Sequence, residues 1–150
     1  MTQTVWPTPH DELWSRGPIA TADPLDQLVH LSNLIGRETR LVQPGGGNTS
    51  IKTESADPAG RSVATLLVKG SGTDLETVGR AGFSRLSLAG LGALRGAATM
   101  TDAEMMRFMA ECMLGREGPT PSVETPLHSL LPHRVIAHTH DVATMSLTNL

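Results

Sequence analysis

The sequence predicts one α/β domain, because helical and extended patterns alternate along most of its 150 residues. Apolar residues recur at helical spacing from Pro24 to about Arg37 and from about Asp102 to Leu114. Between these helices, Val63 to Val68 forms a short apolar run that is typical of a strand in a sheet interior. Residues 1–22 contain three prolines and no periodicity, so we expect an N-terminal arm ahead of a domain at 23–150.

The expected helices carry recognisable start signals. Asp23 is a candidate N-cap followed by a proline, which favours the first position of a helix. Thr101 and Glu104 have the spacing of a capping box at the start of the second long helix. Asp141 precedes a final expected helix from Val142 to Asn149.

The expected strands are separated by polar and glycine-containing turns. Residues 54–62 read as a polar hairpin tip before the interior strand. Residues 83–88 alternate apolar and polar side chains, which is typical of an edge or half-exposed strand. Residues 90–94 are expected to be a turn or short helical piece, and Val135 to Ala137 a buried strand.

Two glycine-rich segments follow apolar stretches. The first is Pro44–Ser50, in which three glycines allow positive φ angles and Asn48 and Ser50 offer side-chain hydrogen bonds. Taken alone, it is more typical of a tight β-hairpin turn than of an anion-binding nest. The second is Lys69–Leu75, and the pair of loops favours a phosphate or carboxylate pocket more strongly than either does alone. Neither loop has the spacing of a Walker or Rossmann motif.

The stretch 119–140 combines a carboxylate with imidazoles. After the candidate N-cap Ser122, Glu124 and His128 are four residues apart and would share one face of a helix. His138 and His140 are two apart at a strand end, so both should point to the same side of the sheet. The pattern indicates a divalent-metal site made of Glu124, His138 and His140.

Each of these residues also has a simpler interpretation. A histidine pair alone is more often structural than metal-binding, and Glu124 would stabilise a helix N-terminus through the macrodipole. His128 and His133 are expected either to contact the metal ligands without binding the metal themselves or to pack against neighbouring side chains.

Composition restricts the function classes. A net charge of −3 and a pI near 6.0 give no electrostatic reason to expect nucleic-acid binding. Cys112 is the single cysteine, which excludes a disulfide framework and favours a reducing compartment. The N-terminus lacks the basic flank and apolar run of a signal peptide, and no segment has the length and apolarity of a membrane span. We therefore expect a cytoplasmic protein without membrane contact.

Four motifs occur in an order that resembles the class II aldolase/adducin family. They are GGGNTSIK (45–52), VKGSGTDL (68–75), PSVETPLH (121–128) and HTHDVATMSLTN (138–149). The short segment between His128 and His138 is most similar to the subgroup that joins a rhamnulose-1-phosphate-type aldolase domain to a short-chain dehydrogenase.

The resemblance implies a three-layer α/β/α fold around a mostly antiparallel sheet, and a homo-oligomer with sites near subunit interfaces. It implies that His138 and His140 bind Zn²⁺ or another divalent metal and that Glu124 is the catalytic acid/base. It further implies four residues that hold the substrate phosphate: Gly47, Asn48, Ser71 and Gly72.

The implied activity is metal-dependent cleavage of a ketose 1-phosphate, such as rhamnulose 1-phosphate, to dihydroxyacetone phosphate and lactaldehyde. Epimerases, dehydratases and decarboxylases share this scaffold, and an adducin-like interaction domain without catalysis is the alternative from another class. Two family features are absent. No histidine follows His140 to serve as a third histidine ligand, and the chain has no tyrosine. We therefore expect an N-terminal fragment, truncated at the C-terminus, that is inactive by itself.

Overall fold

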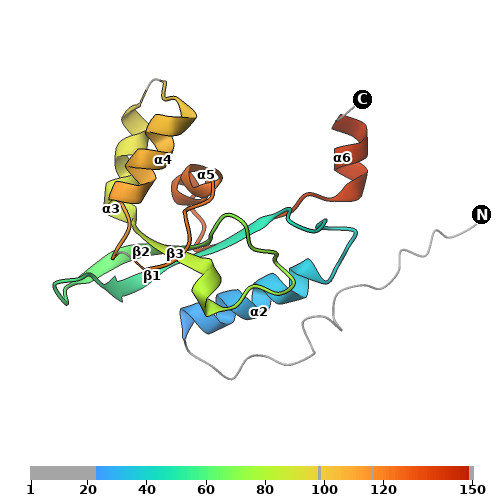
Figure 1. Cartoon of the computed structure of the whole chain (residues 1–150), viewed down its shortest axis with the longest axis horizontal. Coiled ribbons are helices and arrows are strands. Elements are labelled where there is room, and N and C mark those ends of the chain that lie inside the picture. The colour runs from blue at the N-terminus through green and yellow to red at the C-terminus, as the bar shows by residue number, and fades with distance from the viewer. Residues whose placement is uncertain (1–22, 98, 116, 149–150) are drawn as a thin grey trace, which may run out of the picture.

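The computed structural model describes residues 23–97, 99–115 and 117–148; the expected N-terminal arm, 1–22, lies outside them. The described residues form an α/β domain on a four-stranded antiparallel sheet (Figure 1). Its order is β3-β2-β1-β4, and its strands are β1 (Asn48–Ala56), β2 (Ser62–Lys69), β3 (Phe83–Ser87) and β4 (Val135–His138).

Helices lie against both faces of this sheet. Helix α2 runs along one face, whereas α3, α4 and α5 gather over the other, and α6 stands apart from them (Figure 1). The α-helices are α2 (Pro24–Gly36), α3 (Leu88–Leu91), α4 (Asp102–Glu111), α5 (Thr125–Leu130) and α6 (Val142–Thr148), and the 3₁₀ turns are η1 (Arg80–Gly82) and η2 (Gly92–Gly96). None of the described helices combines the length and the apolar character needed to cross a membrane.

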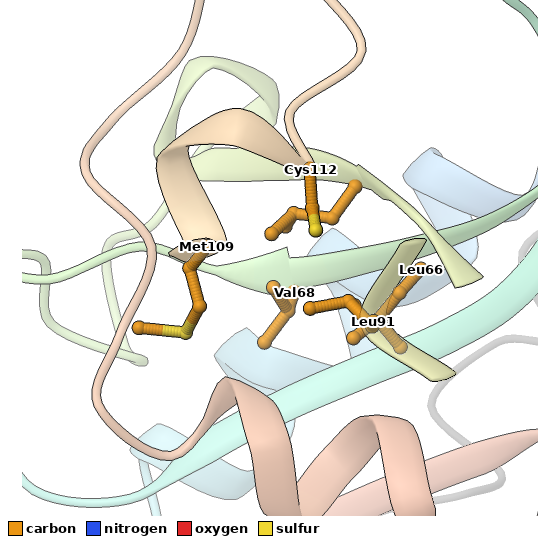
Figure 2. Packing of buried hydrophobic residues seen from close by; sticks show 6 residues of the cluster. Leu66, Val68, Leu91, Met109 and Cys112 are labelled. Carbon is orange, nitrogen blue, oxygen red and sulfur yellow. The ribbon is translucent and has the colours of Figure 1, made fainter. Parts of the chain in front are cut away.

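Strand β2 contributes to two apolar clusters because successive side chains point to opposite faces. Leu66 and Val68 belong to the methionine cluster, which also contains Leu86, Leu91, Met109 and Cys112 (Figure 2). Leu67 belongs to the α2 cluster, which also contains Leu28, Ile51, Val78 and Phe83. The expectation of an interior strand is confirmed, since β2 lies between β1 and β3 and is buried on both faces from Thr65 to Lys69.

The capping predictions are confirmed. The Asp23 carboxylate accepts from the backbone N–H of Leu25 at 2.8 Å, and both bonds of the Thr101–Glu104 capping box are present. Helix α4 ends at Glu111, three residues before the expected end. It ends early because the chain from Cys112 onward pairs with β3, where the Cys112 carbonyl accepts from Ser87 N–H at 2.8 Å.

The prediction for Val135–Ala137 is wrong in one respect. These residues form a strand, but only Ile136 is buried, and Val135 is 44% exposed. The physical reason is position, since β4 is the outer strand of the described sheet and pairs with β1 alone. The alternation of exposed and buried residues is therefore that of an edge strand. The glycine-rich loop is also shorter than expected, since β1 already begins at Asn48.

Candidate metal centre

Strand pairing places the two histidines at the end of β4. His138 is the last residue of the strand and pairs with Asn48 at the beginning of β1. His140 follows after one residue, and its ring centroid lies 4.9 Å from that of His138 in an edge-to-face arrangement. The expectation that both imidazoles lie on the same side is confirmed.

Glu124 approaches both imidazoles from the start of α5. Its Oε1 lies 3.3 Å from His138 Nδ1 and 3.5 Å from His140 Nε2. One ligand atom from each of the three residues lies within 4.8 Å of the other two. Such spacing suits three ligands of one divalent ion, because zinc binds imidazole nitrogen and carboxylate oxygen at about 2 Å.

The local structure that carries Glu124 differs from the expected helix start. Glu124 itself is the N-cap of α5, and its backbone is already in the helical region. Ser122, the expected cap, closes the turn before the helix, where its Oγ accepts from the Glu124 N–H at 3.3 Å. The Glu124 carbonyl accepts from the His128 N–H at 3.2 Å, so the first turn of α5 begins at the metal centre.

Buried polar atoms without hydrogen-bond partners concentrate at this centre. Within the described part of the chain they are Asn48 Oδ1, Thr125 Oγ1, His128 Nε2 and His138 Nδ1. Asn48 pairs with His138 across the strands, and Thr125 follows Glu124 directly. Buried polar atoms are normally hydrogen-bonded, so this concentration indicates a place where a ligand supplies the missing partners. The contact between His138 Nδ1 and Glu124 lacks hydrogen-bond geometry, so this nitrogen has no hydrogen-bond partner in the structure. It is therefore available as a metal ligand.

His128 supports the centre from inside the domain. Its side chain is fully buried, Nδ1 lies 2.7 Å from Ser50 Oγ, and its ring centroid is 6.1 Å from that of His138. Burial lowers the pKa of His128 to about 4, so the imidazole is neutral at physiological pH. The interpretation of His128 as a supporting residue agrees with this geometry. The same interpretation is wrong for His133, since His133 is exposed in the turn after α5.

The first glycine loop lies directly against the metal centre. It joins α2 to β1 and is therefore no hairpin turn. Gly47 has a φ of +72°, and a Cβ on it would lie 2.9 Å from the His138 carbonyl oxygen. A Cβ on Gly46 would lie 3.1 Å from His140 Nδ1. Glycine therefore allows the loop to approach both histidines closely.

The second glycine loop is tied to the first. Asp74 Oδ2 accepts from the Gly45 N–H at 2.8 Å, and the Lys69 carbonyl accepts from Asn48 Nδ2 at 3.3 Å. Ser71 and Gly72 are exposed at the tip of this loop. The Ser71 N–H is already used, since it donates to the Thr120 carbonyl at 2.9 Å, whereas its hydroxyl remains a possible donor to a ligand.

Lys69 is a residue of this region that the sequence did not assign to the site. Its ammonium is buried and donates to the Thr73 carbonyl at 2.7 Å and the Gly70 carbonyl at 3.4 Å. Burial lowers the pKa of Lys69, against the opposing influence of the negative charges of Glu124 and Asp74. The position of Lys69 between an apolar strand and a glycine-containing loop was the sequence feature that could have indicated its role. A buried cation therefore holds the second loop near Glu124.

Comparison with known proteins identifies the family of this domain. The family model described as the class II aldolase and adducin N-terminal domain matches residues 26–150. A curated relative, the uncharacterized oxidoreductase YuxG of Bacillus subtilis, is 42% identical over 123 residues. That match covers 82% of this chain and 18% of YuxG, so the chain spans less than a fifth of its relative.

Two solved structures are similar. The N-terminal class II aldolase domain of a conserved protein from Thermoplasma acidophilum is 35% identical with a TM-score of 0.83, over 100% of this chain and 65% of that one. YgbL of Escherichia coli, a putative aldolase/epimerase/decarboxylase, shares the fold at 14% identity with a TM-score of 0.52, over 83% of this chain and 47% of that one. Because the family model matches residues 26–150, the chain belongs to the class II aldolase and adducin N-terminal domain family.

Proposed function

We propose that this chain carries the metal centre of an aldolase that cleaves a ketose 1-phosphate, such as rhamnulose 1-phosphate, to dihydroxyacetone phosphate and lactaldehyde. The observation that supports the proposal most is the convergence of Glu124, His138 and His140, whose ligand atoms lie within 4.8 Å of one another. A carboxylate and two imidazoles beside partnerless buried polar atoms suit a bound metal and a polar substrate better than they suit a purely structural contact.

His138, His140 and Glu124 would hold Zn²⁺ or another divalent ion. When bound, such an ion polarises substrate oxygens and stabilises negative charge that develops on them. Glu124 is the residue for proton transfer, because a carboxylate next to the reacting carbon can accept or return its proton. His128, buried and neutral, keeps added positive charge away from the ion.

The two glycine loops are proposed to bind the phosphate. Gly47 and Asn48 lie beside the histidines, and Ser71 and Gly72 lie at the tip of the loop that is tied to them. The exposed Ser71 hydroxyl suits a phosphate oxygen. Asn48 Oδ1 lacks a donor and suits a substrate hydroxyl, so Asn48 would orient the sugar as well as border the phosphate.

We further propose that cleavage needs groups that these residues do not supply. The chain has no tyrosine and no histidine after His140, so a tyrosine and a third histidine ligand would have to come from elsewhere. A complete three-layer domain in a cytoplasmic homo-oligomer would bring such groups to the site. We therefore do not expect the 150 residues to be active by themselves.

Metal content tests the proposal first. The protein at its natural length should retain stoichiometric zinc after dialysis, as measured by mass spectrometry of the metal. His138→Ala should weaken zinc binding by more than the roughly 100-fold typical of changes to residues that only support a ligand. The matched control is His133→Ala, which removes an exposed histidine outside the centre and should leave zinc binding unchanged.

Product analysis then separates the chemistries. In the protein at its natural length, rhamnulose 1-phosphate should give dihydroxyacetone phosphate in amounts equal to lactaldehyde, and Glu124→Gln should abolish cleavage. Epimerised or dehydrated sugar in place of these products would assign one of the related activities. A protein that binds no zinc, with His138→Ala indistinguishable from the unchanged chain, would identify a non-catalytic interaction domain.

A further inference from the structure

The second glycine loop lies against the segment that leads to Glu124. Gly70, the first residue after β2, is buried and forms an isolated antiparallel bridge with Pro121, which is also buried. The next residue of the loop, Ser71, donates its N–H to the Thr120 carbonyl at 2.9 Å. The loop therefore holds the chain at a point only three residues before Glu124.

Gly70 is the place where this segment comes closest to the sheet. A Cβ on Gly70 would lie 2.5 Å from Pro119 Cβ, closer still to Pro119 Cγ, and 3.2 Å from the Thr120 carbonyl oxygen. The φ angle of Gly70 is not positive, so its backbone conformation does not itself require glycine. The proline ring is bonded to its own backbone nitrogen and cannot rotate out of the way. Any side chain on residue 70 would therefore displace backbone as well as ring.

The sheet side of this contact is held more firmly than the Pro119 side. Strand β2 ends at the residue before Gly70 and is paired on both of its edges, and the Gly70 N–H donates to the Gly82 carbonyl at 2.9 Å. On the other side, one side-chain bond holds the proline, since Ser84 Oγ donates to the Pro119 carbonyl at 2.8 Å. An added methyl group at Gly70 should therefore push Pro119 away and leave the end of β2 in place.

Such a shift would reach Glu124 through a short turn. The Glu124 N–H donates to Ser122 Oγ at 3.3 Å, so the turn ties the metal ligand to the residue that follows the bridge. Helix α5 cannot follow the shift as a rigid unit, because His128 Nδ1 lies 2.7 Å from Ser50 Oγ and holds the helix on β1. Glu124 would therefore move relative to the two imidazoles of the metal centre.

We propose that Gly70 is a positioning residue of the metal centre: by admitting the Pro119 ring against the end of β2, it sets the position of Glu124 beside His138 and His140. The inference rests on the proposed metal centre and adds to it a residue that offers no ligand atom. Metal ligands must be held within about 0.5 Å of their working geometry, so a displacement smaller than a methyl group weakens binding.

Zinc affinity in a double-mutant cycle tests this role in the protein at its natural length. Gly70→Ala should weaken zinc binding by about 10- to 100-fold, the range typical of residues that position a ligand. In a Pro119→Gly background, which lacks the overlapping ring atoms, the same change should have little effect. Gly79→Ala is the matched control, because a Cβ there meets nothing within 4 Å and the φ of Gly79 is −105°. Denaturant unfolding of each variant separates loss of position from loss of the fold.

Two zinc results would overturn the proposal: unchanged affinity in Gly70→Ala, or an equal loss of affinity with and without Pro119. Crystal structures of the metal-free proteins give a readout that does not need zinc. In Gly70→Ala, Glu124 Oε1 should lie farther from the imidazole nitrogens than the present 3.3 and 3.5 Å, and an unmoved carboxylate contradicts the role of Gly70.

The same pair of measurements separates this inference from the proposed function. An unchanged protein that binds no zinc would contradict the metal centre, whereas the position of Glu124 in the crystals still decides the role of Gly70. If Gly70→Ala does not fold, Ser84→Ala takes its place, because it releases the Pro119 carbonyl without adding volume. Unaltered zinc affinity together with an unmoved Glu124 in that variant would contradict the proposal.

Discussion

Strand β2 borders two regions of opposite character. On one face of the sheet, Leu66 and Val68 of β2 pack with Leu91, Met109 and Cys112 in a cluster of buried apolar side chains (Figure 2). At its C-terminal end, β2 leads into the second glycine loop, and the buried side chains around the metal centre are polar. Both regions are well buried, so burial does not separate them. What separates them is whether the buried atoms have partners within the chain.

This difference has an energetic consequence. A buried polar atom without a partner destabilises a fold by about 1–3 kcal/mol, whereas buried apolar side chains stabilise it. The four such atoms found among the described residues all lie at or beside the metal centre. We therefore expect the methionine cluster to stabilise the domain and the metal centre to lower its stability until a ligand binds. The predictions below test whether the two regions contribute to stability in these opposite ways.

The largest expected effect is in the methionine cluster. Met109 is fully buried, so Met109→Ala should lower the free energy of unfolding by about 2–5 kcal/mol through lost burial and the cavity that remains. Met100→Ala, at a residue that is 40% exposed, should change it by about 0.5 kcal/mol or less. Denaturant unfolding measures both. Zinc affinity should be the same in the two variants. A loss of zinc affinity in Met109→Ala alone would show that the methionine cluster and the metal centre are not independent.

His128 makes the stability of the metal-centre region depend on pH. Its pKa in the folded chain is about 4, against 6.5 when unfolded, so between these values the unfolded chain binds a proton that the folded chain does not. The metal-free protein should therefore lose stability as pH falls from 6.5 to 4, by roughly 3 kcal/mol in total. Below pH 4 this contribution should stay constant.

The control for that prediction is His128→Asn, which keeps a polar atom near Ser50 but does not titrate. The difference in unfolding free energy between the two proteins, measured across this pH range, cancels the contribution of the other groups. A difference that does not vary with pH would mean that the imidazole is not held neutral by burial.

Zinc should stabilise the domain through the metal centre alone. At a free zinc concentration 100 times the dissociation constant, the expected increase in unfolding free energy is about 2.7 kcal/mol. His140→Ala should abolish this increase, whereas Met109→Ala should retain it in full. Thermal unfolding with and without zinc gives the measurement. An increase that survives in His140→Ala would place the ion somewhere else.

Much of the fold was predictable from local chemistry. The N-caps Asp23 and Thr101 and the interior strand are set by residues close in the chain, and all are confirmed. The hairpin is also present, but its tip spans only 57–61 instead of 54–62, since β1 continues to Ala56 and β2 begins at Ser62. The histidine pair was predictable for the same reason, because a period of two places His138 and His140 on one side whatever the rest of the fold does.

The predictions that failed concern features that are set by contacts between residues far apart in the chain. Exposure of Val135 follows from the edge position of β4, which is set by pairing with β1 over 80 residues away. The buried ammonium of Lys69 and the bond between His128 and Ser50 follow from the packing of α5 and the second loop on the sheet. No local pattern reports such contacts, so the residues that support the metal centre were harder to find than its ligands.

The smallest expected effect is at the start of α4, which supports only the methionine cluster. The Thr101 Oγ1 accepts from the Glu104 N–H at 3.3 Å, and the Glu104 carboxylate accepts from the Thr101 N–H at 2.8 Å. Thr101→Ala should therefore lower the free energy of unfolding by about 1 kcal/mol at neutral pH.

At acidic pH, Thr101→Ala should lower the free energy of unfolding by less than it does at neutral pH. The hydrogen bonds from Thr101, the hydroxyl first, lower the pKa of Glu104, so the carboxylate's contribution is present above its unfolded pKa and disappears as pH falls through the folded value. Unfolding of both proteins at neutral and acidic pH should show the difference shrinking in acid, with no change in zinc affinity at neutral pH. Because α4 carries Met109 but no residue of the metal centre, a zinc affinity that followed this cap would show that the two regions are mechanically coupled through β2.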